Sequence, residues 1–141
     1  KPAKKKFSSR VGEGVAWGEK VGLMMPQAFM NCSGEAVDQA VRYYGVSGRD
    51  LLVAHDDLDL DLGRAKLDFE RGSAGHRGVE SIIGFLGKNF YRVRLGIGRP
   101  LRKEEVEGYV LSPFTTGEEE KVEKMLEAGV DYINGWIEGG I

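Results

Sequence analysis

The sequence predicts a single domain of the α/β class, and three observations point to it. The chain has 141 residues, which leaves room for one domain and little more. Apolar residues make up 41% of the chain and charged ones 30%, the balance of an ordinary globular protein that can bury a core. Short apolar or alternating runs that are typical of strands are interspersed with segments whose apolar residues recur at helical spacing.

The first third of the chain predicts two extended segments and then a helix. The extended segments are residues 14–18 and 20–25, and Pro26 ends the second because proline cannot donate to a strand ladder. Ser33 is a suitable N-cap for the following helix, and Gly45 is a suitable stop. The predicted apolar face of that helix consists of Ala36, Val37, Ala40, Val41 and Tyr44.

The turn ahead of this helix contains Asn31. Side chains on strand-to-helix turns commonly face a ligand, but an asparagine can equally well stabilise the turn itself. Both interpretations stay open on these residues alone.

The central stretch, residues 51–78, is the most informative part of the chain. Leu51–Ala54 is a continuous apolar run that predicts a buried strand. His55-Asp56-Asp57 follows at its carboxyl end, where the ligand crevice of open α/β sheets lies. Alternation over residues 64–70 predicts a second strand, and the glycine-rich loop 72–78 leads into a helix. A carboxylate, a loop and a helix N-terminus therefore converge on one predicted site.

The rest of the chain predicts a helix, a strand and a long last helix. Apolar spacing over residues 79–86 predicts a helix that ends at Gly87. Residues 91–97 alternate, so that Arg92 and Arg94 would form one basic face of a strand. Thr116 to Glu119 has the spacing of a capping box at the start of the last helix.

Charge is distributed unevenly along the chain. The net charge is −2, but residues 64–103 carry +7 and residues 104–141 carry −8. A basic segment of this kind is typical of a polyanion site, although the two surfaces can equally neutralise each other in the fold. One cysteine, no apolar run of membrane length and no segment shaped like a signal peptide predict a cytoplasmic protein without a membrane partner.

Two other kinds of site are less well supported by the residues. Asp56, Asp57, Asp59 and Asp61 are clustered as hard cations require, but the glycine and the terminal glutamate of an EF-hand are missing. The glycines of the loop 72–78 fit neither the Rossmann nor the Walker spacing. Arg77 could nevertheless bring a charge-assisted contact to a phosphodiester.

A hydrolytic mechanism near neutral pH would need a general base, most often a histidine held by a carboxylate. The chain contains two histidines, His55 and His76. His55 and Asp56 are adjacent on a predicted strand, so their side chains point to opposite faces. His76 could contact a ligand or merely begin a helix. The residues thus predict an orienting carboxylate without its histidine.

Four segments together carry a recognisable signature. They are residues 26–34 (PQAFMNCSG), 55–60 (HDDLDL), 72–78 (GSAGHRG) and 92–100 (RVRLGIGRP). In this order they closely resemble the bacterial-type peptidyl-tRNA hydrolase family, over nearly the whole chain. The resemblance implies a single domain, residues 1–141, with a twisted mixed β-sheet flanked by helices. It also implies hydrolysis of the ester between a peptide and the tRNA 3′ ribose, without a metal or cofactor, by a protein expected to be monomeric.

The resemblance also implies roles for individual residues. Asp56 matches the aspartate that orients the catalytic histidine, and Asn31 matches a residue that positions water or the carbonyl. Phe29 and Met30 match the lining of the peptidyl–ribose site, to which the loop residues Gly75, His76 and Arg77 also belong. Three further basic residues fall where the family tends to contact tRNA phosphates: Lys66, Arg94 and Lys103.

Two departures from the family pattern have consequences. The family's catalytic histidine lies in an N-terminal strand–helix unit that this chain lacks, so we expect an exposed gap or sheet edge. Arg77 stands where a substrate-binding asparagine is common, and arginine cannot accept a hydrogen bond. Two alternatives therefore stay open: a non-catalytic RNA-binding relative of the same fold, and a metal-dependent hydrolase that uses Asp56 to Asp61.

Overall fold

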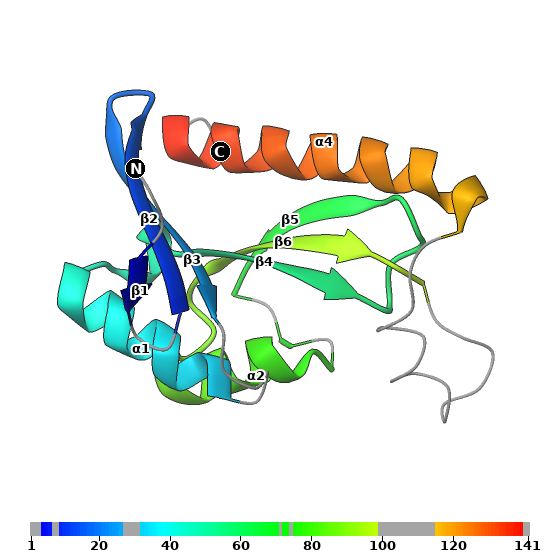
Figure 1. Ribbon diagram of the computed structural model, residues 1–141. Coiled ribbons are helices and arrows are strands. Elements are labelled where there is room, and N and C mark those ends of the chain that lie inside the picture. Colours follow the sequence, from blue (N-terminus) through cyan, green and yellow to red (C-terminus); the bar gives the residue numbers. More distant parts are fainter. Residues whose placement is uncertain are drawn as a thin grey trace.

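The computed structural model describes two small sheets and three α-helices (Figure 1). The residues that it describes are 4–6, 9–26, 32–70, 72–73, 75–98 and 115–139. Strands and helices alternate through most of the chain, which confirms the predicted α/β class. In the described ranges, no helix combines the length and the apolar character that crossing a bilayer requires.

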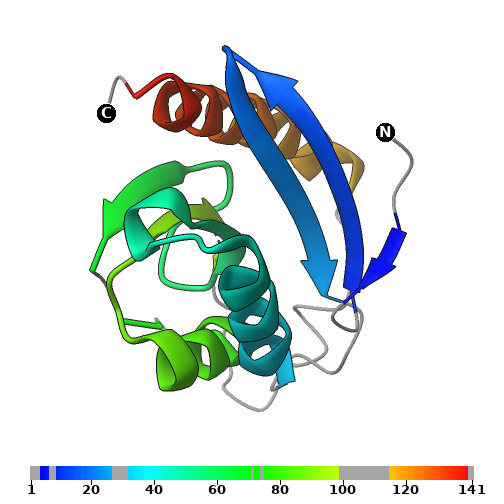
Figure 2. The same ribbon diagram turned by 90° about the vertical axis from the view of Figure 1, so that its left-hand side faces the viewer.

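The first sheet is antiparallel, in the order β1-β2-β3. Its strands are β1 (Lys4–Lys6), β2 (Ser9–Ala16) and β3 (Glu19–Pro26). Ala16 pairs with Glu19, so the hairpin turn consists of Trp17 and Gly18, both with positive φ. Positive φ at both positions gives the twist that suits a two-residue hairpin. In Figure 2 the hairpin lies to the right of the mixed sheet, and β3 also contacts α1.

The second sheet is mixed and has the order β4-β6-β5. Its strands are β4 (Leu52–Asp57), β6 (Tyr91–Gly96) and β5 (Ala65–Phe69). β4 runs parallel to β6 and β5 runs antiparallel to it, which confirms the mixed character of the predicted sheet. β4 continues beyond the apolar run, so its last residues are the polar ones of the candidate site.

Two helices cover one face of the mixed sheet and a third covers the other (Figure 1). α1 (Ser33–Tyr44) and α2 (Arg77–Leu86) pack together, and α4 (Thr116–Glu138) lies against β5 and β6. A short 3₁₀ turn, η2 (Gly48–Asp50), precedes β4. The core between the paired helices and β4 consists of Val37, Val79, Ile82 and Phe90, with Val53 packed against it.

Two predicted helix starts were wrong by one residue. Cys32, not Ser33, is the N-cap of α1. Thr115, not Thr116, is the N-cap of α4, and its N–H donates to Oε1 of Glu118 at 2.9 Å. The predicted stops at Gly45 and Gly87 are confirmed as C-caps.

Candidate active site

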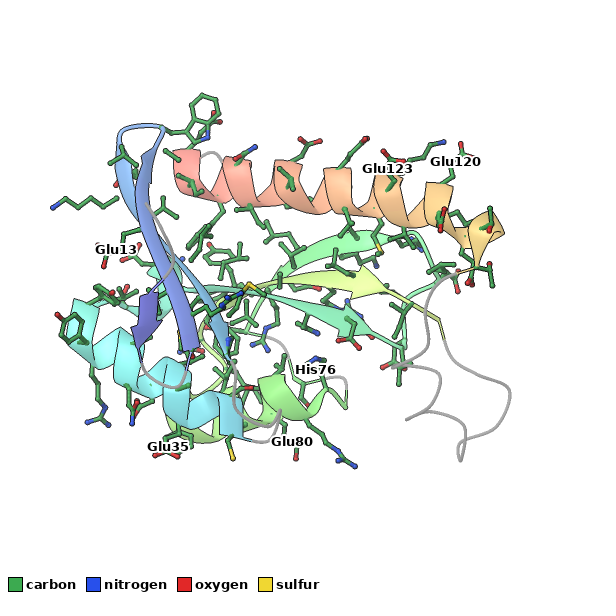
Figure 3. The ribbon with its side chains drawn as sticks, in the orientation of Figure 1. Glu13, Glu35, His76, Glu80, Glu120 and Glu123 are labelled. Atoms are coloured by element: carbon green, nitrogen blue, oxygen red, sulfur yellow. The ribbon has the colours of Figure 1, made fainter. Side chains whose placement is uncertain are left out.

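The candidate site forms where the carboxyl end of β4 meets the amino end of α2. Asp56, the second-to-last residue of β4, has its Oδ1 atom 3.0 Å from Nε2 of His76. The His76 side chain is 13% exposed and that of Asp56 is 36% exposed, so the pair is shielded but still reachable from solvent. Figure 3 labels His76 at the amino end of α2, on the side of the mixed sheet away from α4. The convergence that the sequence predicted is therefore present.

His76 has both of its ring nitrogens engaged. It is the N-cap of α2, and its Nδ1 accepts a hydrogen bond from the backbone N–H of Val79 at 3.1 Å. Since that nitrogen accepts, the proton of the neutral ring lies on Nε2 and is donated to Asp56. His76 is thus positioned to orient Asp56, and taking a proton from water would require it to give up the helix cap.

Asp56 is held in its ionised form. The hydrogen bond from His76 is the largest cause of a pKa below the ordinary value for a carboxyl group, and it outweighs the opposing effect of burial. Electrostatic interaction with the two neighbouring imidazoles, His76 and His55, lowers the pKa of Asp56 as well. Near neutral pH, Asp56 is therefore a carboxylate that accepts hydrogen bonds.

His55 lies beside this pair but is buried, with 6% of its surface exposed. Its Nδ1 is 2.8 Å from the backbone oxygen of Asp56, which can only accept, so Nδ1 carries the proton. Its ring centroid is 5.0 Å from that of His76. Burial lowers the pKa of His55, which keeps the ring neutral, and Nε2 has no hydrogen-bond partner among the described residues. As predicted, the carboxylate of Asp56 does not pair with His55.

Arg94, predicted to contact tRNA phosphates, is instead buried. Its Nε donates to Oδ2 of Asp57 at 2.7 Å, and its Nη1 donates to Oδ2 of Asp68 at 3.0 Å. Burial opposes its charge, but the hydrogen bonds and charges of the two aspartates prevail and raise its pKa. The role predicted from the resemblance therefore does not fit this geometry, because both bonded nitrogens point at carboxylates inside the protein.

Arg92, the other member of the predicted basic face, is also fully buried. Its Nη2 donates to the backbone oxygen of Lys88 at 2.7 Å, and its guanidinium lies 4.1 Å from the ring centroid of Phe90. The basic face predicted for this strand is therefore buried inside the protein. The buried charge of Arg92 is compensated by backbone oxygen and the face of the Phe90 ring. The buried charge of Arg94 is compensated by two carboxylates.

The remaining predicted site residues divide into three groups. Gly75, with φ of +80°, and Arg77, exposed in the first turn of α2, flank His76. Lys66 is exposed on β5, where it stands opposite Arg94 of β6 in the strand register. Four residues lie outside the part of the chain that the structure describes: Phe29, Met30, Asn31 and Lys103.

The sequence analysis did not predict two contacts at the site: the hydrogen bond between Asp56 and His76, and the ion pair between Asp57 and Arg94. Asp57 and Arg94 carry opposite charges at positions that point to one face of adjacent strands, which is a signal that could have revealed their ion pair. The contact between Asp56 and His76 joins residues 20 apart in sequence, and no local pattern predicts it.

Comparison with known proteins places this geometry in a family. A family model described as peptidyl-tRNA hydrolase matches residues 1–141. The chain is 41% identical to a peptidyl-tRNA hydrolase of Rhodospirillum rubrum, over 98% of this chain and 57% of that protein. It is 43% identical to one of Rhizobium etli (strain CIAT 652), over 92% of this chain and 54% of that protein. The chain thus spans a little over half the length of these curated relatives.

A solved structure agrees with the sequence matches. A point mutant of the peptidyl-tRNA hydrolase of Acinetobacter baumannii has a TM-score of 0.92 to this chain, with 32% sequence identity. The alignment covers 97% of this chain and 71% of that one. The match of the family model over all 141 residues and these relatives lead to one conclusion: the chain belongs to the peptidyl-tRNA hydrolase family.

Proposed function

We propose that the protein carrying these 141 residues hydrolyses the ester that links a peptide to the 3′ ribose of tRNA, and so recycles the tRNA. The single observation that carries this proposal is the ionised Asp56 at the carboxyl end of β4, oriented by His76 and open to solvent. Membership of the family supports the choice of substrate.

In the proposed mechanism Asp56 orients a general base. Neither histidine of the chain suits that role, because His76 has both nitrogens engaged and His55 is buried. We therefore propose that Asp56 accepts a hydrogen bond from a further histidine that these residues do not contain. That imidazole would take a proton from water, the water would attack the ester carbonyl, and the proton would pass to the leaving 3′ oxygen. Asn31 would position the water or the carbonyl.

Two features of the structure support a further segment beside the site. β4 and β3 each lie at an edge of their described sheets, and a free edge can pair with another strand. Two large apolar side chains on β3, Leu23 and Met25, are also more than half exposed. We propose that the segment carrying the base covers part of this surface.

The proposed partner is the acceptor end of peptidyl-tRNA. Arg77 and Lys66 are exposed and could contact its phosphates, and Arg77 would do so through charge-assisted hydrogen bonds. Lys103, Phe29 and Met30 are further proposed contacts, on the basis of the family pattern alone. We also propose that the protein acts in the cytoplasm as a monomer, which suits its single cysteine and its substrate.

The test is Asp56→Asn in the full protein, with N-acetyl-aminoacyl-tRNA as substrate. An asparagine keeps an acceptor for His76 but loses the charge that stabilises a protonated base. We expect kcat to fall by roughly a hundredfold or more while tRNA binding is retained. Asp61→Asn, which removes a charge from an exposed position of the same segment, is the control and should keep wild-type turnover.

Three results would contradict the proposal. Turnover that survives Asp56→Asn would exclude the assigned role of this carboxylate. Binding of tRNA without hydrolysis by the wild-type protein would favour a non-catalytic RNA-binding relative. Activity that a chelator abolishes and Mg²⁺ restores would favour the metal-dependent alternative.

A further inference from the structure

The guanidinium of Arg94 connects all three strands of the mixed sheet. Arg94 itself belongs to β6, its Nε bonds to Asp57 on β4, and its Nη1 bonds to Asp68 on β5. The side chains of Arg94 and Asp57 are 5% and 0% exposed. A buried ion pair with short, well-directed bonds constrains geometry more strongly than an exposed one.

Asp57 links the buried ion pair to the end of β4 through further hydrogen bonds. Its second carboxylate oxygen, Oδ1, accepts the backbone N–H of Asp59 at 2.7 Å, which fixes the turn that follows the strand. Its backbone oxygen accepts the N–H of Ile97 at 3.0 Å, beyond the end of β6. Asp57 is therefore bonded through both its side chain and its backbone, directly after Asp56.

We propose that Arg94 is a positioning residue for Asp56, acting through Asp57, and that it does not contact the RNA. The order of contacts runs from Arg94 to Asp57, along one peptide unit to Asp56, and from Asp56 to His76. Loosening the first contact would let the end of β4 shift relative to α2. This inference rests on the proposed function for its kinetic readout, but the contact that it predicts can be measured without turnover.

Arginine suits this position for a geometric reason. Its planar guanidinium donates in two directions at once, to one carboxylate through Nε and to another through Nη1. Lysine carries the same charge but concentrates it at one point, so it cannot hold both aspartates in the same arrangement. A phosphate contact would behave differently, since lysine also binds phosphates well.

The experiment compares Arg94→Lys with the wild-type full protein in three measurements. We expect kcat for N-acetyl-aminoacyl-tRNA to fall roughly tenfold to a hundredfold, because small misplacements of catalytic groups have effects of this size. KM and the dependence of tRNA binding on salt should stay as in the wild type. The ring resonances of His76, assigned by their loss in His76→Gln, should shift because its contact with Asp56 changes.

Two further variants separate positioning from loss of stability. Ile82→Val removes one methylene from the buried core and should lower the melting temperature while kcat at 25 °C stays unchanged. If Arg94→Lys does not fold, Asp68→Asn replaces it, since this variant keeps the bond between Arg94 and Asp57. In Asp68→Asn the His76 resonances should stay in place, and tRNA affinity should not rise.

The outcomes are distinguishable. Wild-type kcat in Arg94→Lys together with unshifted His76 resonances would overturn the positioning role. Tighter tRNA binding by Asp68→Asn, with a slope of log K against log salt that is steeper by about one, would show that Arg94 had gained a phosphate contact, and would overturn the positioning role as well. If the wild-type protein neither binds nor hydrolyses the tRNA, the proposed function fails, whereas the His76 resonances still decide the role of Arg94.

Discussion

His55 and His76 lie side by side at the end of β4 but are held in different tautomers. The proton of His76 is on Nε2, where it binds the carboxylate of Asp56, and the proton of His55 is on Nδ1, where it binds the backbone oxygen of the same residue. Two neutral rings thus hold one aspartate from two directions. Burial is the main reason why the surroundings disfavour protonation of His55, and the neighbouring ring of His76 adds to it.

The buried His55 predicts how stability changes with pH. Its pKa in the folded state lies below the ordinary value of 6.5, which the unfolded chain retains. As the pH falls through that value, the unfolded chain takes up a proton that the folded protein excludes. His55 therefore leaves stability unaffected above about pH 6.5 and reduces it progressively below.

Urea unfolding between pH 7.5 and 5.5 measures this effect. The wild-type midpoint should decrease as the pH is lowered, and His55→Gln should decrease less, because the amide does not titrate in this range. His76 is retained in both proteins, so the difference between the two curves reports His55. Parallel curves over the whole range would show that His55 is protonated equally easily in both states.

For single residues, the sequence predicts that Asp56 belongs to the site, but it does not predict that His76 is its hydrogen-bond partner. Its place after an apolar strand at the carboxyl edge of a sheet follows from local pattern. Its contact with His76 depends on how α2 is packed, and the burial of Arg94 depends on which residues of β4 and β5 stand opposite it. Register is a tertiary property, so alternation alone could not show whether the arginines face solvent or carboxylates.

Among the elements, the crossing of α1 and α2 fixes the position of the helix that carries His76. Gly34 marks a close approach of the two helices: its N–H donates to the hydroxyl of Ser81 at 2.8 Å, and a Cβ at this position would clash with the backbone oxygen of Ser81. Backbone cannot move aside as a flexible side chain can. A larger residue at Gly34 must therefore push the helices apart.

Gly34→Ala should lower the free energy of unfolding by about 1–3 kcal/mol, the usual effect of overpacking. Gly84→Ala is a matched control, because Gly84 is exposed in α2 and has no atom within 4 Å of the Cβ position. Alanine there should raise the free energy of unfolding by up to about 1 kcal/mol through helix propensity. Chemical unfolding of both variants measures the contrast, and equal effects would show that the helices are not in close contact at Gly34.

The elements were largely predictable, whereas their ends were not. Apolar spacing predicted α1, α2, α4 and the strands β4 to β6, because each buries one face on a shared core. β2 begins at Ser9, five residues earlier than predicted, since glycines at positions 12 and 14 obscure its alternation. The helix starts were misplaced because the N-cap is set by backbone angles and not by side-chain type alone.

Over the whole molecule, charge is divided between the two faces of the mixed sheet. The outer surface of α4 carries Glu120 and Glu123, on the side away from His76 (Figure 3). Part of the predicted basic segment is neutralised internally, as the pairing of Arg94 with Asp57 and Asp68 shows. The partners of Arg94 come from β4 and β5 and not from the acidic segment 104–141. Arg77 is exposed at the amino end of α2, and a polyanion site there stays a prediction.

This division of charge predicts which charged side chains affect tRNA binding. At physiological ionic strength the interaction between exposed charges is largely screened beyond about 8 Å, so only charges near the path of the RNA should alter binding. Arg77→Gln should weaken tRNA binding and reduce the slope of log K against log salt by about one. Glu80→Gln, in the same first turn of α2, should strengthen binding because it removes a repulsive charge.

Glu123→Gln is the control for this prediction, because it changes the same charge on the opposite face of the sheet and should leave both the affinity and the slope unchanged. Filter binding over a salt series measures all three variants. Equal effects of Glu80→Gln and Glu123→Gln would mean that tRNA responds to net charge alone. A loss of affinity confined to Arg77→Gln and a gain confined to Glu80→Gln would place the RNA over the amino end of α2, beside Asp56.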